Sequence, residues 1–297
     1  MSVMAAGADD PSRAVIVVSS HVVRGSVGNR AAVFALETLG FPVWAVPTVV
    51  LPWHPGQGPG TRIVPPAEDF AALMGELARA KWLGEVQAVL SGYLADPGQA
   101  DAVAALVRAV KARNPHALYL CDPVIGDRGG LYVAEEIAAR QRDLLMPMAD
   151  IATPNRYELE WMTGVTLETP AAVAEAALDA GPATMLVTSA PPLMARSTGN
   201  LMVTADLAMV AEHRVIEKPV NGLGDLTAAL FLARLLDGQA PARALQTTTE
   251  SVFEVLARTA KRGADELTLE TDAQSLAHPM AMVQTRYIQH PSGGRRA

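Results

Sequence analysis

The most informative stretch of this 297-residue chain is residues 220–230, with the sequence VNGLGDLTAAL. Gly222 and Gly224 precede Asp225, which opens a long run of apolar, helix-forming residues. Glycine lets the backbone turn its N–H groups inward, and a helix N-terminus favours negative charge. Asp225 could accept a proton from a hydroxyl group while those N–H groups hold a phosphate. The stretch therefore indicates phosphoryl transfer to an alcohol. The alternative is a loop in which Asp225 only caps a helix.

The rest of the chain predicts an α/β fold. Short β-branched runs alternate with segments rich in alanine and leucine, which is typical of a mostly parallel sheet flanked by helices on both faces. The expected strands are apolar on both faces, as strands buried between two layers should be. These strands cover residues 14–19, 42–46, 88–91, 117–121, 150–153 and 185–188. The expected helices cover residues 29–39, 67–80, 98–113, 157–163, 170–179 and 225–236. Residues 201–203 and 207–211 could pair as antiparallel edge strands, and residues 243–262 should form a final long helix.

No break in composition divides the chain. We therefore expect a single domain over residues 1–297, with flexible ends at residues 1–12 and 290–297. The one unusual segment is residues 51–66, which contain five prolines and three glycines. An excursion of this composition between regular elements is more often a functional loop than a structureless connection. We predict that this segment, called the lid below, covers a bound ligand.

The composition narrows the class of protein. Half of the residues are hydrophobic, which is ample for a large core, and the formal net charge is −7. That charge argues against nucleic acid or an anionic membrane as the main partner. Cys121 is the only cysteine, which excludes an intrachain disulfide and a multi-cysteine metal site. The first residues lack the regions of a signal peptide, and no apolar run reaches ~20 residues, so we expect a cytoplasmic protein.

Polar residues follow most of the expected strands. In open parallel sheets, ligands bind beyond the carboxyl ends of the strands, so these residues should share one rim. Each alone is a weak signal, and their combination with residues 222–225 is what points to a site. They are Ser20, His21, Thr48, Gly92, Tyr93, Asp122, Asn155, Glu158, Thr188 and Ser189.

Together these segments resemble the pyridoxal kinases of the ribokinase-like superfamily. The resemblance runs in family order through SHVVRGSVGNRAA at residues 20–32, SGY at 91–93, CDPVIGD at 121–127, TPN-x-x-E at 153–158, VTS at 187–189 and G-x-G-D at 222–225. It implies a ribokinase-like fold and ATP-dependent phosphorylation of the 5′-hydroxymethyl group of pyridoxal, giving pyridoxal 5′-phosphate and ADP. Pyridoxine and pyridoxamine are further candidate substrates. The resemblance also implies a homodimer.

The resemblance assigns the chemistry to the G-x-G-D segment. Asp225 would take the proton from the hydroxymethyl group as that group attacks ATP. The backbone N–H groups of Gly222, Leu223 and Gly224 would hold the transferring phosphoryl charge, and donors of this kind are typically worth ~10²–10³ in rate.

The resemblance also assigns a nucleotide and cation site. Asp127 would approach Mg²⁺, because hard cations prefer oxygen ligands. The residues around a monovalent cation, K⁺ or Na⁺, would be Asp122, Thr153, Glu158 and Thr188. The residues that contact ATP would be Asp122, Asn155, Glu158, Thr188, Ser189, Ile216, Gly222 and Gly224. From the residues alone, Asp122 and Asp127 could instead be turn or loop acids, and Asn155 with Glu158 could form a helix capping box.

The substrate side is assigned in the same way. Ser20, Val27, Thr48 and Tyr93 map onto the pyridoxal pocket, next to Asp225. A hydroxyl group can bond the pyridine nitrogen or the ring hydroxyl, and Tyr93 offers an apolar wall with a polar tip. The alternative for Tyr93 is a half-buried aromatic residue at a strand end. From the lid, we expect Trp53 or His54 to contact pyridoxal, with packing of Trp53 on the protein body as the alternative.

Two departures from the family pattern leave other functions open. The lid reads VLPWHPGQ at residues 50–57 where the family often has QFSNHT, and only the histidine is kept. The usual Gly-Thr-Gly-Asp is GLGD here, which loses a hydroxyl group but no backbone donor. The rewritten lid favours, as an alternative, a kinase of another hydroxymethyl heterocycle such as hydroxymethylpyrimidine. A non-catalytic protein that binds pyridoxal phosphate is a third possibility, and retention of Asp225 and its flanking glycines argues against it.

Overall fold

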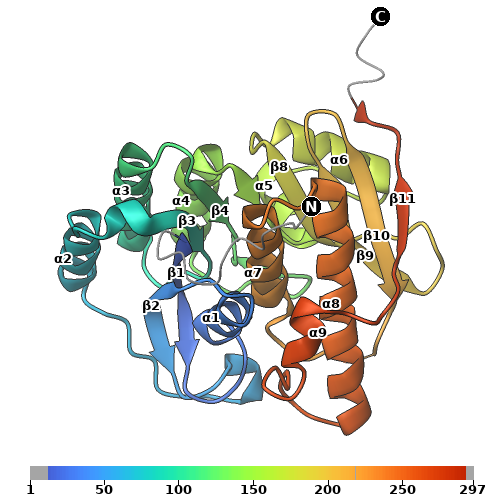
Figure 1. The fold of residues 1–297 in the computed structure, drawn as a ribbon, viewed down its shortest axis with the longest axis horizontal. Helices are drawn as coiled ribbons and strands as arrows, with labels where there is room; N and C mark the ends of the chain where they lie inside the picture. The colour runs from blue at the N-terminus through green and yellow to red at the C-terminus, as the bar shows by residue number, and fades with distance from the viewer. Residues whose placement is uncertain (1–12, 218, 292–297) are drawn as a thin grey trace, which may run out of the picture.

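The computed structural model describes residues 13–217 and 219–291, which build a nine-stranded sheet with helices on both faces (Figure 1). This architecture confirms the predicted α/β fold. The flexibility expected of residues 1–12 and 292–297 lies outside the described residues. His290, which we expected in a flexible end, lies with its Nε2 atom 2.9 Å from the carbonyl oxygen of Thr204.

The strand order across the sheet is β11-β10-β9-β8-β7-β4-β3-β1-β2. Strands β2, β1, β3, β4, β7 and β8 run parallel to one another, and β8, β9, β10 and β11 pair antiparallel. The bounds are β1 Ala14–Val22, β2 Val43–Leu51, β3 Val86–Ser91, β4 Leu118–Cys121, β7 Ile151–Ala152, β8 Thr184–Ala190, β9 Ser197–Val203, β10 Ala208–Arg214 and β11 Gln284–Tyr287. All six predicted parallel strands are therefore present, and the two antiparallel strands are present beside them.

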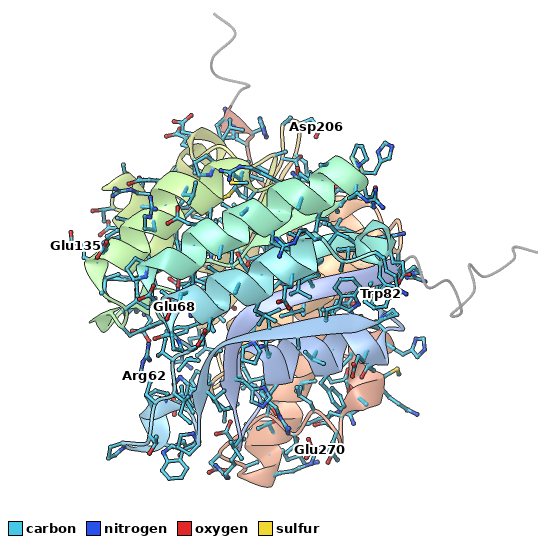
Figure 2. All side chains as sticks on the ribbon, turned by 90° about the vertical axis from the view of Figure 1, so that its left-hand side faces the viewer. Arg62, Glu68, Trp82, Glu135, Asp206 and Glu270 are labelled. Carbon is cyan, nitrogen blue, oxygen red and sulfur yellow. The ribbon has the colours of Figure 1, made fainter. Side chains whose placement is uncertain are left out.

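Two apolar layers explain why the strands are hydrophobic on both faces. In β1, Ile16 and Val18 pack into one core cluster and Val15 and Val17 pack into the other. Figure 2 looks onto the β2 edge and shows the strands between two sets of helices. The first layer holds α2 Ala67–Ala78, α3 Pro97–Arg113, α4 Glu135–Arg140, α5 Arg156–Thr163 and α6 Pro170–Asp179. The second holds α1 Asn29–Thr38, α7 Leu223–Leu236, α8 Pro241–Arg262 and α9 Ala273–Ala277.

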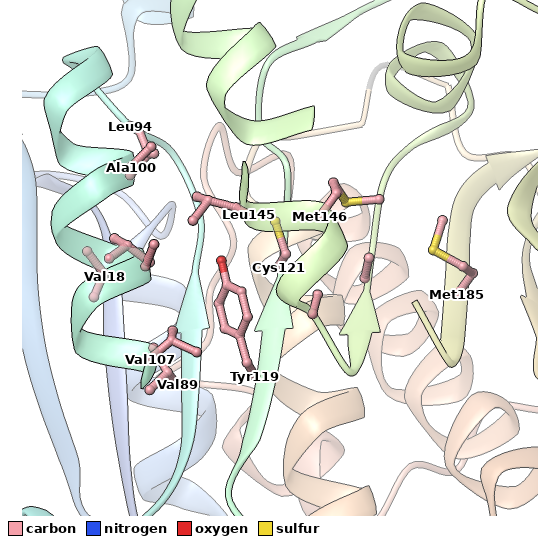
Figure 3. Close-up of a cluster of buried hydrophobic side chains, with 14 of the residues drawn as sticks. Val18, Val89, Leu94, Ala100, Val107, Tyr119, Cys121, Leu145, Met146 and Met185 are labelled. Carbon is pink, nitrogen blue, oxygen red and sulfur yellow. The ribbon is translucent and has the colours of Figure 1, made fainter. Parts of the chain in front are cut away.

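The single cysteine is part of the first core and not of a reactive site. Figure 3 shows Cys121 beside Tyr119 among aliphatic side chains, and both are fully buried. Burial raises the pKa of the Cys121 thiol to about 12. The buried Tyr119 hydroxyl has its own partner, the hydroxyl of Ser91 at 2.8 Å. Because a cysteine reacts as its thiolate, Cys121 is inert at neutral pH.

The structure differs from the sequence-based expectation at the two sheet edges. Strand β2 continues through Pro47 to Leu51, because an edge strand can accommodate a proline that lacks an N–H donor. At the other edge, β10 is covered by β11, a mostly exposed four-residue strand without an apolar run. Helix α8 is the last long helix, as expected, and the five-residue α9 and strand β11 follow it.

A short hairpin of β5, Gly126–Asp127, and β6, Gly130–Leu131, was also not predicted. It is too short to carry a hydrophobic pattern. Among the described residues, no helix is long and apolar enough to cross a membrane.

Candidate active site

Two adjoining cavities lie beyond the carboxyl ends of the parallel strands, where the sequence placed the site. The first has a volume of about 530 Å³ and the second about 1180 Å³. Both are lined by Asp127, Asn155, Thr188, Ser189 and Gly224, which mark the junction between them. The first cavity also holds the expected substrate residues Ser20, Val27, His54, Tyr93 and Asp225. Leu223 and Ile216 line the second cavity. A small molecule in the first cavity could thus meet an extended one from the second.

The turn before α7 is fixed by one of its two glycines. Gly222 has φ 92°, and a Cβ at this position would overlap the carbonyl oxygen of Ser26. Helix α7 begins at Leu223, so its first backbone N–H groups have no partner within the helix, and Leu223 and Gly224 line the second cavity. A Cβ on Gly224 would meet no atom within 4 Å, so this glycine leaves open space where the two cavities join.

Asp225 lies in the first turn of α7, three residues after the N-cap, and is not the cap itself. The N-cap residue is Gly222, and no side chain caps this helix. The carboxylate of Asp225 is instead stabilised in its ionised form by the backbone N–H groups of Gly28, the N-cap of α1, and of Asp225 itself. Burial raises the pKa of Asp225 to about 6. The capping alternative is therefore wrong, and the structure presents a half-buried carboxylate on the wall of the first cavity.

Asp122 and Glu158 bring two buried carboxyl groups to the same wall. Burial, together with the charge of Asp225, raises the pKa of Asp122 to about 8. The hydroxyl of Thr153 donates to Asp122 at 2.8 Å. Burial, with the charge of Asp122, also raises the pKa of Glu158 well above its usual range. These carboxyl groups repel one another, so a cation among them would be stabilised.

Glu158 also has a structural role that the sequence left as an alternative. Its Oε2 accepts from the N–H of Asn155 at 2.7 Å, and the N–H of Glu158 donates to the side chain of Asn155 at 2.9 Å. This reciprocal pair is the capping box expected at the start of α5. The other carboxylate oxygen of Glu158, Oε1, accepts a hydrogen bond from the N–H of Ile125 at 3.0 Å. Both oxygens of Glu158 thus have backbone partners.

Asp127 is the most exposed of the expected cation residues. It sits in the β5–β6 hairpin, where its Oδ1 accepts from the N–H of Gly129 at 2.7 Å in a turn, and it lines both cavities. Across the described ranges, no group of three histidine, cysteine, aspartate or glutamate residues is arranged to hold a metal ion. The expected cation site therefore depends on hydroxyl, backbone or ligand oxygens in addition to carboxylates.

The strand end at Thr188 and Ser189 is distorted toward the junction. The β8–β9 register shifts between Val187 and Ala190, and Ser189 has φ 52°, which is unusual for a residue with a Cβ. The N–H of Thr188 donates to the carbonyl of Pro154 at 2.9 Å. This bulge turns both hydroxyl-bearing residues onto the walls of the two cavities.

Thr48 differs from the expectation because it does not line either cavity. It is fully buried, and its hydroxyl donates to the carbonyl of Tyr93 at 2.7 Å. Thr48 therefore stabilises the backbone of Tyr93 from the side that faces away from the cavity. Tyr93 itself lines the first cavity, and its hydroxyl accepts from Arg62 of the lid at 2.9 Å.

The lid lines the first cavity with His54, one of the two residues expected there, and not with Trp53. His54 lines the wall, and its Nδ1 accepts from the N–H of Gly56 at 3.1 Å. Burial lowers the pKa of His54, partly opposed by the charge of Glu266, so the ring is neutral with its proton on Nε2. Trp53 is outside the lining, and its indole N–H donates to Gly58 of the same loop at 3.1 Å.

Several lining residues carried no sequence signal. Arg62 and Asn221 are single polar residues in loops, and Tyr132 follows the unpredicted hairpin. Tyr132 is half exposed, and its partial burial, with the charges of Glu158 and Asp122, raises the pKa of its hydroxyl, which is therefore protonated at neutral pH. The apolar lining residues Val22, Leu51 and Val124 lie beside them.

Known proteins match this chain over most of its length. A family model described as phosphomethylpyrimidine kinase matches residues 81–270. Pyridoxal kinase PdxY of Rubrobacter xylanophilus is 39% identical over 281 residues, which cover 92% of this chain and 97% of that protein. Pyridoxal kinase PdxY of Corynebacterium diphtheriae is 36% identical and covers 92% of this chain and 99% of its own length.

Solved structures agree with these relatives. The pyridoxal kinase of Leishmania donovani in complex with ADP and pyridoxamine has a TM-score of 0.87 and 28% identity, over 93% of this chain and 100% of that one. The order of the motifs, the paired cavities and these matches lead to one assignment: the chain belongs to the pyridoxal kinase family, with the ribokinase-like fold.

Proposed function

We propose that this kinase transfers the γ-phosphoryl group of ATP to the 5′-hydroxymethyl group of pyridoxal, giving pyridoxal 5′-phosphate and ADP. The observation that carries the proposal is the position of Asp225. It is a half-buried carboxylate on the wall of the first cavity, one residue from Gly224, at which the two cavities meet. In this assignment the first cavity takes the vitamin and the second takes the nucleotide.

Asp225 acts as the general base. Its pKa of about 6 leaves it ionised at neutral pH, yet far closer to that pH than an ordinary aspartate, which suits a base that must accept a proton during the reaction. The backbone N–H of Gly28 favours the ionised form of the carboxylate. The proton of the hydroxymethyl group passes to Asp225 as the oxygen attacks phosphorus, and ADP leaves on the opposite side.

The N-terminus of α7 holds the transferring phosphoryl group. The backbone N–H groups of Gly222, Leu223 and Gly224 lie at the left-handed turn and the first helical turn, where no helical partner is available. Donors that are already oriented toward developing negative charge cost no reorganisation during transfer. Because these donors are main-chain groups, the missing threonine of the family pattern does not remove them.

The buried carboxyl groups fit hard cations. Asp122 shares its wall with Asp225, and the protonation forced on Asp122 at neutral pH would be relieved by a nearby positive charge. We assign a K⁺ or Na⁺ site to Asp122, Thr153, Glu158 and Thr188, and contact with Mg²⁺ to Asp127. When bound, Mg²⁺ would neutralise phosphate charge during transfer. Glu158 contributes its charge more than a free oxygen, since backbone donors occupy both oxygens.

The vitamin is held by Ser20, Val27, His54 and Tyr93. The Ser20 hydroxyl and the Nε2–H of neutral His54 offer polar contacts, and Tyr93 and Val27 offer apolar walls. The nucleotide phosphates would meet Asn155, Thr188 and Ser189 at the junction, with Ile216 further along the second cavity.

A second candidate substrate is hydroxymethylpyrimidine. It is favoured by the description of the matching family model and by the rewritten lid, which shares only His54 with the usual pattern. Both substrates carry a hydroxymethyl group on a nitrogen heterocycle, so the base and the phosphate site would serve either. A non-catalytic role in binding pyridoxal phosphate is disfavoured by the intact Asp225 and its flanking glycines.

The experiment that tests the function is a coupled assay for ADP release. Pyridoxal, pyridoxine, pyridoxamine and hydroxymethylpyrimidine are compared at equal concentration with Mg²⁺ and K⁺ present. We expect the highest kcat/KM among the three vitamin B6 forms. A higher kcat/KM for hydroxymethylpyrimidine would make it the preferred substrate in place of pyridoxal. If none of the four compounds led to ADP release, the proposal that this protein phosphorylates such alcohols would be overturned. We also propose a homodimer, on the resemblance to the family, and light scattering during gel filtration would test it.

A further inference from the structure

The segment after α8 touches two separate walls of the first cavity. Residues 265–267 follow the glycine that ends α8, and they lie between the lid and the loop at residues 24–28. Both of those segments reach the cavity, the lid through His54 and the loop through Val27. Residues 265–267 do not line either cavity themselves. They are therefore in a position to act on the site only through their neighbours.

The lid contact is made by Gln57. Its side-chain amide donates to the carbonyl of Asp265 at 3.2 Å and to Oε1 of Glu266 at 3.3 Å. Gln57 ends the short 3₁₀ turn Pro55–Gln57, whose N-cap is His54. The same side chain thus fixes the turn that presents His54 to the cavity.

The contact with the loop at residues 24–28 is made by the carboxylate of Glu266, which lies close to the backbone of Gly25. Gly25 has φ +110°, and a Cβ there would lie 2.7 Å from Oε2 and 2.9 Å from Oε1 of Glu266. The carboxylate therefore packs against the bare backbone of the loop. One residue further on, the Ser26 hydroxyl donates to the carbonyl of Leu267 at 3.1 Å. The loop then leads to Gly28, whose N–H favours the ionised form of the Asp225 carboxylate.

The carboxylate of Glu266 is buried and only partly satisfied by hydrogen bonds, which is unusual for a residue with a purely structural role. It is 9% exposed, and its Oε2 has no hydrogen-bond donor among the residues that the structure describes. The Arg24 guanidinium lies 3.6 Å from the other oxygen, Oε1. A buried carboxylate with one unsatisfied oxygen is costly, and such groups in native proteins call for an explanation.

We propose that Glu266 and Gln57 form a latch that holds the lid closed over the vitamin, which makes Glu266 a positioning residue for the reaction. The inference rests on the assignment of the first cavity to the vitamin. The latch joins the lid to the loop that leads to Gly28 and Asp225. Glu266 therefore contacts both the closed lid and the loop next to the base. The charge of Glu266 strengthens the hydrogen bond from Gln57 beyond that of a neutral pair.

The latch predicts a selective effect on one substrate. If only the closed lid binds pyridoxal well, the apparent affinity falls with the fraction of closed molecules. Loss of a hydrogen bond to a charged group should then raise KM for pyridoxal on the order of 10-fold in Gln57→Ala. KM for ATP should stay within about 2-fold, because the lid does not line the second cavity. Glu266→Ala should show the same rise in KM and an additional fall in kcat, since the loop before Gly28 loses its support.

The test combines kinetics with a readout that does not depend on turnover. Arg62 is an exposed trypsin site in the lid, so the rate of cleavage after Arg62 reports lid opening. We expect pyridoxal to slow this cleavage in the wild type, and we expect faster cleavage in both variants. The Glu266→Ala, Gln57→Ala double variant should be no worse in KM for pyridoxal than Glu266→Ala alone. Glu270→Gln, an exposed acid four residues away, is the matched control and should resemble the wild type.

The outcomes separate the latch from the proposed function. Gln57 is exposed on the lid, so its substitution should not threaten folding if Glu266→Ala proves unstable. Wild-type KM for pyridoxal together with wild-type cleavage after Arg62 in Gln57→Ala would overturn the latch. An equal rise in KM for both substrates would also overturn it. Faster cleavage in the variants of a protein that fails to phosphorylate pyridoxal would retain the latch and reject the proposed function.

Discussion

The junction end and the lid end of the first cavity are built in different ways. At the junction, Asp122, Asn155, Glu158 and Asp225 stand at strand ends or helix starts, and each has a hydrogen-bond partner that the surrounding secondary structure fixes. At the lid end, the wall is largely a loop of exposed residues that is fastened by side chains such as Gln57. The sheet thus fixes the chemistry, and a loop adjusts the fit of the substrate. Changes at the junction should cost turnover, whereas changes at the lid should cost affinity for one substrate.

The largest effect should come from removal of the base at the junction. Asp225→Asn keeps the shape of the side chain but removes its ability to accept a proton. We expect kcat to fall by ~10²–10⁴ while the affinity for ADP, measured by calorimetry, stays near the wild-type value. Asp69→Asn on the exposed face of α2 is the control. A variant within a few-fold of wild type would leave Asp225 as a structural residue only.

The pH profile of the wild type sharpens the same point. Asp225 must be ionised to accept the proton, and burial raises its pKa to about 6. Activity should therefore rise with pH through this region, where an ordinary aspartate would already be fully ionised. The measurement is kcat/KM for pyridoxal between pH 5 and pH 8, and a flat profile over this range would contradict the prediction.

Substitution of the two glycines at the junction should reduce two different properties, stability at Gly222 and activity at Gly224. Gly222→Ala places a side chain in the left-handed region and against the carbonyl of Ser26, so stability should fall by roughly 1–3 kcal/mol from backbone strain alone. Gly224→Ala has room in the helix and should not lose stability, because alanine is the better helix former by about 1 kcal/mol. Its methyl group would instead enter the space between the two cavities and reduce kcat/KM, on the order of 10²-fold. Urea unfolding and kinetics on both variants distinguish the two losses, and equal stabilities would refute the argument.

The cation site should give a smaller, pH-dependent effect. The pKa of Asp122 is raised to about 8, so the folded protein binds a proton there that the unfolded chain releases above about pH 4. Stability without cations should therefore fall as pH rises toward 8, and Asp122→Asn should flatten this dependence. K⁺ and Mg²⁺ should raise the melting temperature of the wild type more at pH 8 than at pH 5. In the variant, kcat/KM for ATP should fall about 10-fold. A wild-type rate that is unchanged when K⁺ is replaced by a bulky organic cation would exclude the monovalent site.

The lid should give the smallest and most selective effect. His54→Ala removes a polar group from the cavity wall and should raise KM for pyridoxal roughly 3–10-fold, with KM for ATP nearly unchanged. Trp53→Ala should do less, because its indole contacts Gly58 of the same loop and lies off the wall. A larger effect at Trp53 than at His54 would show that the lid changes conformation when the vitamin binds and brings Trp53 onto the cavity wall.

The sequence determined the features that follow from local pattern. Apolar residues on both faces of residues 14–19 predicted a strand buried between two layers, because side chains alternate along a strand. Asn155 and Glu158 predicted a capping box, because the pattern needs only four consecutive residues. The G-x-G-D order predicted a helix start beside a phosphate site. The helix begins two residues earlier than expected, since Gly222 takes the capping position itself.

Only the tertiary structure decided the contacts between distant segments. Thr48 lies behind Tyr93 and not on the cavity wall, because β2 continues past Pro47 at the sheet edge. Arg62 meets Tyr93, and Gln57 meets Glu266, about 200 residues away in the chain. Periodicity reports which face of an element is buried, but not which other element covers it. These partnerships depend on how the whole sheet is wound, which no single stretch of the sequence encodes.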